Sequence, residues 1–185
     1  MSSLILASAS PRRRELLSLA GFSFDVITAD VDEVLDASLT ASQLVMSLAF
    51  QKASAVASAH TDSTVIGADT VVVLDGKVLG KPHSDAEAKE MLRSLSGRTH
   101  EVYTGVCMIK GDKVHQFFEC TKVTFYPLEQ ELIDSYVASG DCNDKAGSYG
   151  IQGQGCVLVK GIEGDYFNVV GFPVARFCRE IKAFA

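Results

Sequence analysis

The chain has 185 residues, long enough for one domain with a full core or for two lobes sharing a cleft, and 47% hydrophobic and 22% charged residues are the ordinary mix of a globular protein. Its net charge of −6 argues against binding to nucleic-acid polymers, which requires a basic surface that displaces counterions. The apolar runs are too short to cross a bilayer and no export signal is evident, so we expect a cytoplasmic protein with no membrane partner. The five cysteines lack a C-x-x-C pair, so we expect reduced thiols.

The predicted elements alternate between strand and helix early in the chain and become antiparallel in the middle. Strands are expected at 4–7, 22–28, 64–67, 70–74, 77–79, 99–109 and 114–125, and a further hairpin through 162–165. Helices are expected at 11–20, 41–59, 85–96 and 128–138, and from Pro173 onward. Ser10 is the expected cap of the first helix, and the motifs at 40–43 and 84–87 have the form of capping boxes. This order predicts an α/β fold with a mixed sheet, in one domain of residues 1–185.

The segment between the first strand and the first helix combines hydroxyls with cations. Ser8 and Ser10 precede Arg12 and Arg13, which fall in the first helical turn. Free backbone N–H groups and the positive end of the helix dipole attract phosphate there, and arginine forks match its oxygens. Cations at a helix start are unfavourable unless an anion is bound nearby. Two interpretations remain open, a phosphate-binding turn or a solvated basic helix end.

Lys52 lies in the middle of the apolar face of the second long helix. Val45 precedes it by seven residues and Val56 follows it by four, so the three residues share one side of the helix. A lysine is rarely buried without a partner. Either the side chain extends along its stem to solvent, or it points into a cleft and meets an anion.

Two carboxylates are candidates for chemistry. Asp69 interrupts the apolar run at 65–73, and burying a lone carboxylate is costly, so it needs a partner or marks a site. The alternative is an aspartate at a bulge, bonded to local backbone. Thr70 and the Gly80-Lys81-Pro82 turn come soon after Asp69 in the sequence, which favours a functional site over a bulge. Glu33, in the acidic loop 30–33, is the second carboxylate, and the oxygens of Glu33 and Asp69 suit Mg²⁺ or Mn²⁺, which also bind phosphates.

The stretch 144–155 is rich in glycine. Glycines allow backbone to approach a flat ligand, and the Gln152 amide both donates and accepts toward a base edge. A mobile surface loop is the alternative. The chain has no P-loop motif and no histidines spaced for a metal, and its four histidines are expected on the surface.

Several short motifs follow one another along almost the whole chain. They are Leu6-Ala7-Ser8-x-Ser10-Pro11-Arg12-Arg13, Gly67-Ala68-Asp69-Thr70, Gly80-Lys81-Pro82, Leu95-Ser96-Gly97, Asp144-Lys145-Ala146-Gly147-x-Tyr149-Gly150-Ile151-Gln152-Gly153 and Gly171-x-Pro173. Each is modest alone, but the ordered set resembles the Maf family of nucleotide pyrophosphatases. The resemblance implies a strongly twisted mixed sheet flanked by helices, two lobes with a central cleft, and often a homodimer.

The resemblance also implies an activity, the hydrolysis of a nucleoside triphosphate to the monophosphate and pyrophosphate with a divalent metal. Asp69 is similar to the family's general base, with Glu33, Lys52 and Lys81 around it. The positions that set base choice in the family correspond to Arg12, Thr70 and Gln152.

The segment 144–153 resembles the subgroup that acts on dTTP and UTP, including modified pyrimidine nucleotides. The alternatives are a 7-methyl-GTP or broad-range enzyme for non-standard nucleotides, and a nucleotide-binding regulator of cell division.

Overall fold

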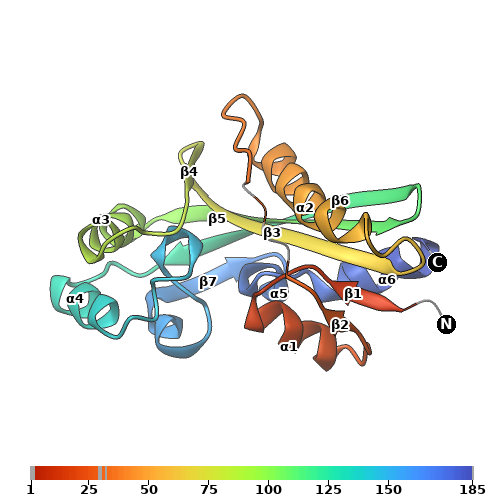
Figure 1. The fold of residues 1–185 in the computed structure, drawn as a ribbon. Coiled ribbons are helices and arrows are strands. Elements are labelled where there is room, and N and C mark those ends of the chain that lie inside the picture. The colour runs from red at the N-terminus through yellow and green to blue at the C-terminus, as the bar shows by residue number, and fades with distance from the viewer. Residues whose placement is uncertain (1–2, 29–30, 32, 185) are drawn as a thin grey trace. The chain divides into compact units, whose positions relative to one another are not determined.

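The structure is a computed structural model that describes residues 3–28, 31 and 33–184 (Figure 1). Its helices are α1 (Pro11–Leu19), α2 (Ala41–Ala57), α3 (Asp85–Leu95), α4 (Gln130–Ala138), α5 (Tyr166–Val170) and α6 (Val174–Phe184), with 3-10 turns η1 (Ala146–Ser148) and η2 (Gly153–Leu158). Its strands are β1 (Leu4–Leu6), β2 (Asp25–Val26), β3 (Thr64–Leu74), β4 (Lys77–Leu79), β5 (Thr99–Lys110), β6 (Lys113–Phe125) and β7 (Val159–Glu163). Within the described ranges, no helix is long and apolar enough to span a membrane.

The strands form a seven-stranded mixed sheet in the order β2-β1-β3-β5-β6-β7, with β4 paired to β3. β1 runs parallel to both β2 and β3, whereas β4 is antiparallel to β3 and β7 is antiparallel to β6. β5 and β6 are neighbours joined by a two-residue turn, in which Gly111 has a φ of +55°. The predicted α/β fold with a mixed sheet is confirmed.

The three predicted cap side chains accept the expected backbone hydrogen bond, whereas the helix expected from residue 128 begins at Gln130 without a side-chain cap. Thr40 and Gln43 form both halves of a capping box, and the Ser10 hydroxyl accepts from the Arg13 amide. At α3 only half of the expected capping box forms. The Ser84 hydroxyl accepts from the Glu87 amide, but the Glu87 carboxylate accepts from the His83 amide at 2.7 Å and not from the Ser84 amide.

Three strand predictions need correction. The strand expected at 22–28 is only the two residues of β2, and both are exposed, so little apolar surface stabilises a longer one. The segments 64–67 and 70–74 are one continuous strand, β3. Asp69 does not interrupt the strand, because its carboxylate forms an ion pair with Lys52. The hairpin expected through 162–165 is wrong, since β7 ends at Glu163 and the chain turns at Gly164, with a φ of +126°, into α5.

The chain divides into two compact units. The first contains residues 1–70, 104–119 and 171–185, within which Ala29, Asp30, Asp32 and both chain ends lie outside the described residues. In this unit α2 packs closely on β3 and β5 (Figure 1), since a Cβ on Gly67 would overlap the Ala49 carbonyl and one on Gly105 would overlap the Val45 carbonyl. These two glycines set the distance between α2 and the sheet.

The second unit contains residues 71–103 and 120–170, and has its own core. The core is built from α3, α4 and the facing strands, and includes Leu92, Val123, Phe125 and Ile133. His100 is also buried there, with 2% of its surface exposed, and its Nε2 lies 2.7 Å from the Tyr149 hydroxyl. The expectation that all histidines are on the surface is therefore wrong for His100.

Candidate functional site

Lys52 forms ion pairs with both candidate carboxylates. Its Nζ pairs closely with Asp69 Oδ1 and lies 3.0 Å from Glu33 Oε1. The Lys52 and Asp69 side chains are 18% and 13% exposed, so most of this pair is shielded from water. Lys52 therefore meets an anionic partner and does not extend freely to solvent, and Asp69 is a paired carboxylate inside a regular strand, not a bulge residue.

The pairing follows from the close packing of α2 on β3. Asp69 lies two residues after Gly67, so both point to the face of β3 that α2 covers. Lys52 lies between Ala49 and Ala53, which contact Gly67 and pack in the core under α2. A larger residue at position 67 would push the helix and its lysine away from the carboxylate.

A second polar cluster surrounds the Arg13 guanidinium. Its Nη2 donates to Thr70 Oγ1 at 3.1 Å, its Nη1 to Ser8 Oγ at 3.3 Å and its Nε to the Gly171 carbonyl at 2.9 Å. Thr70 Oγ1 also lies 2.9 Å from Thr104 Oγ1. The arginine thus joins the segment after β1, the middle of β3 and the turn between α5 and α6.

Burial lowers the pKa of Arg13, and the nearby Asp69 carboxylate opposes that shift. The two clusters are thus electrostatically coupled, although Asp69 and Thr70, as neighbours in a strand, point to opposite faces of the sheet. Ser10 and Arg12 complete the α1 end of this region. The Ser10 amide donates to Ser8 Oγ at 3.2 Å, and Arg12 is half-buried in the first turn.

The remaining two predicted site residues, Lys81 and Gln152, belong to the second unit. The segments that carry them are tied together, because the Gly147 amide donates to the Gly80 carbonyl at 2.9 Å. Gly147 has a φ of +67°, and a Cβ there would lie 3.0 Å from the Val72 side chain, so glycine is required. Lys81 is exposed and Gln152 is half-buried.

The glycine-rich segment is held by side chains on both sides, which contradicts a mobile surface loop. The Tyr136 hydroxyl accepts from the Gly150 amide at 3.1 Å and donates to Asp141 Oδ2 at 3.2 Å. Lys145 Nζ bonds the carbonyl and the carboxylate of Asp141 and lies 2.9 Å from Asp144 Oδ1. This network fixes the backbone that leads to Gln152.

Comparison with known proteins assigns the family. Residues 3–184 match the family described as Maf-like protein. The chain belongs to the Maf family. Relatives of this Maf chain from Bacillus mycoides (strain KBAB4) and Bacillus anthracis are named dTTP/UTP pyrophosphatase. Each is 56% identical over 184 residues, covering 100% of this chain and 96% of its own.

The Maf chain also resembles a solved structure, a nucleoside-triphosphatase / dITP/XTP pyrophosphatase from Mycobacterium abscessus ATCC 19977 / DSM 44196. The two are 13% identical, with 98% of this chain and 97% of that chain covered and a TM-score of 0.49. That likeness is too distant to add to the family assignment.

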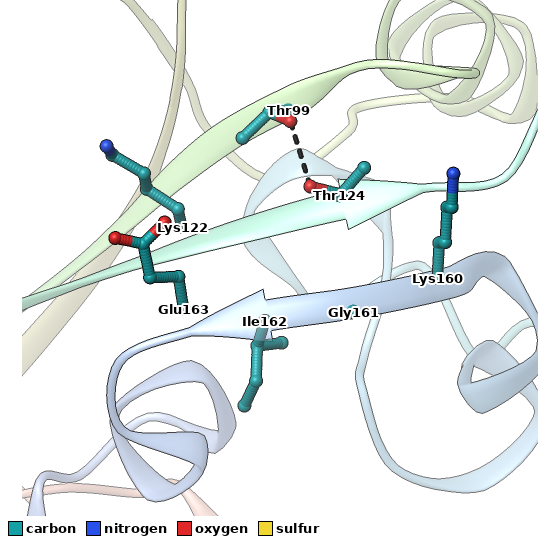
Figure 2. A pocket seen from close by; sticks show the side chains of 7 residues that line it. All are labelled: Thr99, Lys122, Thr124, Lys160, Gly161, Ile162 and Glu163. Carbon is teal, nitrogen blue, oxygen red and sulfur yellow. Dashed lines mark hydrogen bonds between the residues drawn. The ribbon is translucent and has the colours of Figure 1, made fainter.

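A hollow of about 440 Å³ lies elsewhere in the second unit of the Maf chain, where β5, β6 and β7 adjoin (Figure 2). Lys122 and Glu163 face each other across β6 and β7, and Thr99 bonds Thr124 at 2.8 Å. None of the predicted site residues lines this hollow, so it is separate from the candidate site.

The structure also adds to the candidate site three residues that the sequence analysis did not name as site residues. Thr104 and the Gly171 carbonyl bind members of the Arg13 cluster, and Gln51 holds the backbone beside Glu33. Of the three, only Gly171 had a signal in the sequence, the Gly171-x-Pro173 motif. A threonine within a strand and a glutamine on a helix carry no distinguishing pattern.

Proposed function

We propose that this Maf protein hydrolyses nucleoside triphosphates, chiefly dTTP and UTP, to the monophosphate and pyrophosphate. The ion-paired cluster of Lys52 with Asp69 and Glu33 carries the proposal, because it sets a partly buried carboxylate beside an ammonium group suited to phosphate. The full-length identity of 56% to relatives named dTTP/UTP pyrophosphatase supports the same substrates.

In the proposed reaction, cations and hydroxyls hold the triphosphate chain. Ser8 and Ser10 lie at the start of α1, where the helix dipole favours an anion, and Arg12 supplies a guanidinium there. Three Arg13 donors bind Ser8, Thr70 and Gly171, which fixes the guanidinium in this turn, where it adds positive charge for the phosphates. Lys52 and Lys81 neutralise charge on the remaining phosphates.

Asp69 is the proposed general base. Its carboxylate orients a water and accepts its proton as the water oxygen bonds to the α-phosphorus. The bond from the α-phosphorus to the oxygen that bridges to the β-phosphate breaks, and pyrophosphate leaves with the bond electrons. Lys52, bonded to Asp69, fixes the direction of the carboxylate and screens it from the incoming phosphates.

The donor set fits a divalent cation that arrives with the substrate. Within residues 3–28, 31 and 33–184, no group of three or more His, Cys, Asp or Glu side chains could hold a metal. Glu33 and Asp69 nevertheless face one shared cation, Lys52, and Mg²⁺ is commonly held by one or two carboxylates together with substrate phosphates. Bound there, Mg²⁺ or Mn²⁺ would neutralise phosphate charge.

Gln152 is the proposed reader of the base. Its amide both donates and accepts, which matches the O4 and N3–H edge shared by thymine and uracil, and a cytosine inverts that pattern. The network around Tyr136 and Lys145 supports this role, since it restricts the backbone on which the amide sits.

The test uses purified protein with Mg²⁺ or Mn²⁺ and each canonical triphosphate, as well as 7-methyl-GTP, with both products identified. The expected result is pyrophosphate and monophosphate from dTTP and UTP. Orthophosphate as the first product would indicate a phosphatase, and nucleotide binding without turnover would indicate a regulator. Gln152→Ala is expected to reduce the preference for dTTP over GTP, and an unchanged preference would remove its assignment. Sizing by light scattering tests for the expected homodimer.

A further inference from the structure

The Gln51 side chain on α2 binds the backbone of the loop that carries Glu33. The Val34 amide donates to Gln51 Oε1 at 2.9 Å, and Gln51 Nε2 donates to the Val34 carbonyl at 3.2 Å. The side-chain amide thus satisfies both polar groups of one residue, as a neighbouring strand would. Ser47, one turn earlier on α2, accepts from the same Nε2 at 3.3 Å and steadies the amide.

Hydrophobic burial does not hold this loop in place. Val34 and Leu35 are each 69% exposed, and the loop between Glu33 and Leu39 contains no helix or strand. The Asp36 carboxylate accepts from the amide and hydroxyl of Ser38 at 2.9 and 2.6 Å, but these contacts are local and shape only the turn. The connection to α2 therefore matters for where Glu33 lies.

Gln51 and Lys52 are consecutive residues, and they bind consecutive residues of the loop. Lys52 Nζ lies 3.0 Å from Glu33 Oε1, while Gln51 binds Val34. The Glu33 side chain is 40% exposed, so its contact with Lys52 competes with water and with its own rotamer freedom. Fixing the next backbone unit removes the backbone freedom of the loop, so that only side-chain freedom opposes the ion pair.

We propose that Gln51 is a positioning residue that keeps the Glu33 carboxylate beside Lys52 and Asp69 by clamping Val34. The functional part of this inference rests on the proposed pyrophosphatase activity. Gln51 acts on the loop backbone and not on substrate, because both polar atoms of its side-chain amide are engaged by Val34 and Ser47. Its effect on turnover passes through Glu33 alone, which is what separates it from a residue that only stabilises the fold.

The first test measures the clamp without reference to activity. Gln51→Met keeps the length and helix preference of the side chain but loses both hydrogen bonds. The Val34 amide is expected to exchange with deuterium about tenfold faster in this variant than in the wild type. Gln116→Met is the matched control, since it also removes a glutamine bond to backbone but at a different place, from Gln116 Nε2 to the Met46 carbonyl of α2 at 3.0 Å. Equal exchange of Val34 in the wild type and Gln51→Met would overturn the proposal.

The second test is a double-mutant cycle in kcat with dTTP. Gln51→Met is expected to lower kcat about tenfold with little change in KM, and Gln116→Met to leave kcat unchanged. In the Glu33→Gln background, Gln51→Met is expected to have no further effect. Independent, multiplying effects would show that Gln51 does not act through Glu33 and would refute its positioning role. A wild-type protein inactive on every triphosphate would instead overturn the proposed function, and amide exchange would still decide the clamp.

Discussion

The buried His100 predicts a specific loss of stability in acid. Its imidazole is 2% exposed and packs edge-on against Phe125 at a centroid distance of 4.9 Å. Its Nε2 pairs with the Tyr149 hydroxyl, and within the described part of the chain its buried Nδ1 has no hydrogen-bond partner. A charged imidazolium would leave a buried N–H donor unsatisfied in apolar surroundings. Burial accordingly lowers the pKa of His100 from its ordinary value of 6.5 to about 4.

The sign and size of the effect follow from proton linkage. Between these two pKa values the unfolded chain binds a proton at His100 and the folded chain does not, so acid favours unfolding. The contribution is fully present above pH 6.5 and is lost as the pH falls toward 4. The free energy of unfolding is expected to fall by about 2 kcal/mol at about pH 5 through this residue alone, and by about 3 kcal/mol below both pKa values.

The assay is urea unfolding followed by far-UV circular dichroism at about pH 7.5 and about pH 5. His100→Gln cannot titrate and keeps an amide that can reach Tyr149. It is expected to be less stable than the wild type at the higher pH because the packing is altered, yet to lose about 2 kcal/mol less on acidification. His83→Gln, at an exposed histidine, is the control and should follow the wild type. Equal losses in the wild type and His100→Gln would refute the neutral, buried state of His100.

Three further substitutions test the packing and charges of the site. Gly67→Ala is expected to cost about 2–3 kcal/mol of stability in urea unfolding, because the new methyl overlaps the α2 backbone, and to lower activity more than stability alone explains. Lys52→Met leaves Asp69 without its ammonium partner, and kcat/KM with dTTP is expected to fall about 100-fold with the circular dichroism spectrum retained; an unchanged kcat/KM would remove Lys52 from the mechanism. Tyr136→Phe deprives the Gly150 amide of its acceptor, so the free energy of unfolding is expected to fall by about 1–2 kcal/mol and KM for dTTP to rise. Wild-type values of both quantities would show that the hydroxyl does not restrain the glycine-rich segment.

Much of the local structure was predictable because its signals lie within a few residues of one another. The Thr40 capping box depends on residue 43, and the α1 cap on residue 13, so both are visible in a short window of sequence. The exceptions have local competitors. The Glu87 carboxylate binds the His83 amide and not the amide of the capping residue. β2 is only two residues long because its side chains are exposed.

The amino-acid sequence by itself determined the alternation of elements, the candidate residues and, through ordered motifs, the family. Only the tertiary structure decided which candidates meet. Asp69 and Lys52 are 17 residues apart, and Arg13 bonds groups 57 and 158 residues away. The contact of Lys52 with Asp69 depends on how closely α2 packs on β3 and β5, which Gly67 and Gly105 permit by lacking a Cβ. The burial of His100 and the Gln51 clamp are likewise properties of distant chain segments packed together, and no periodicity in the sequence encodes them.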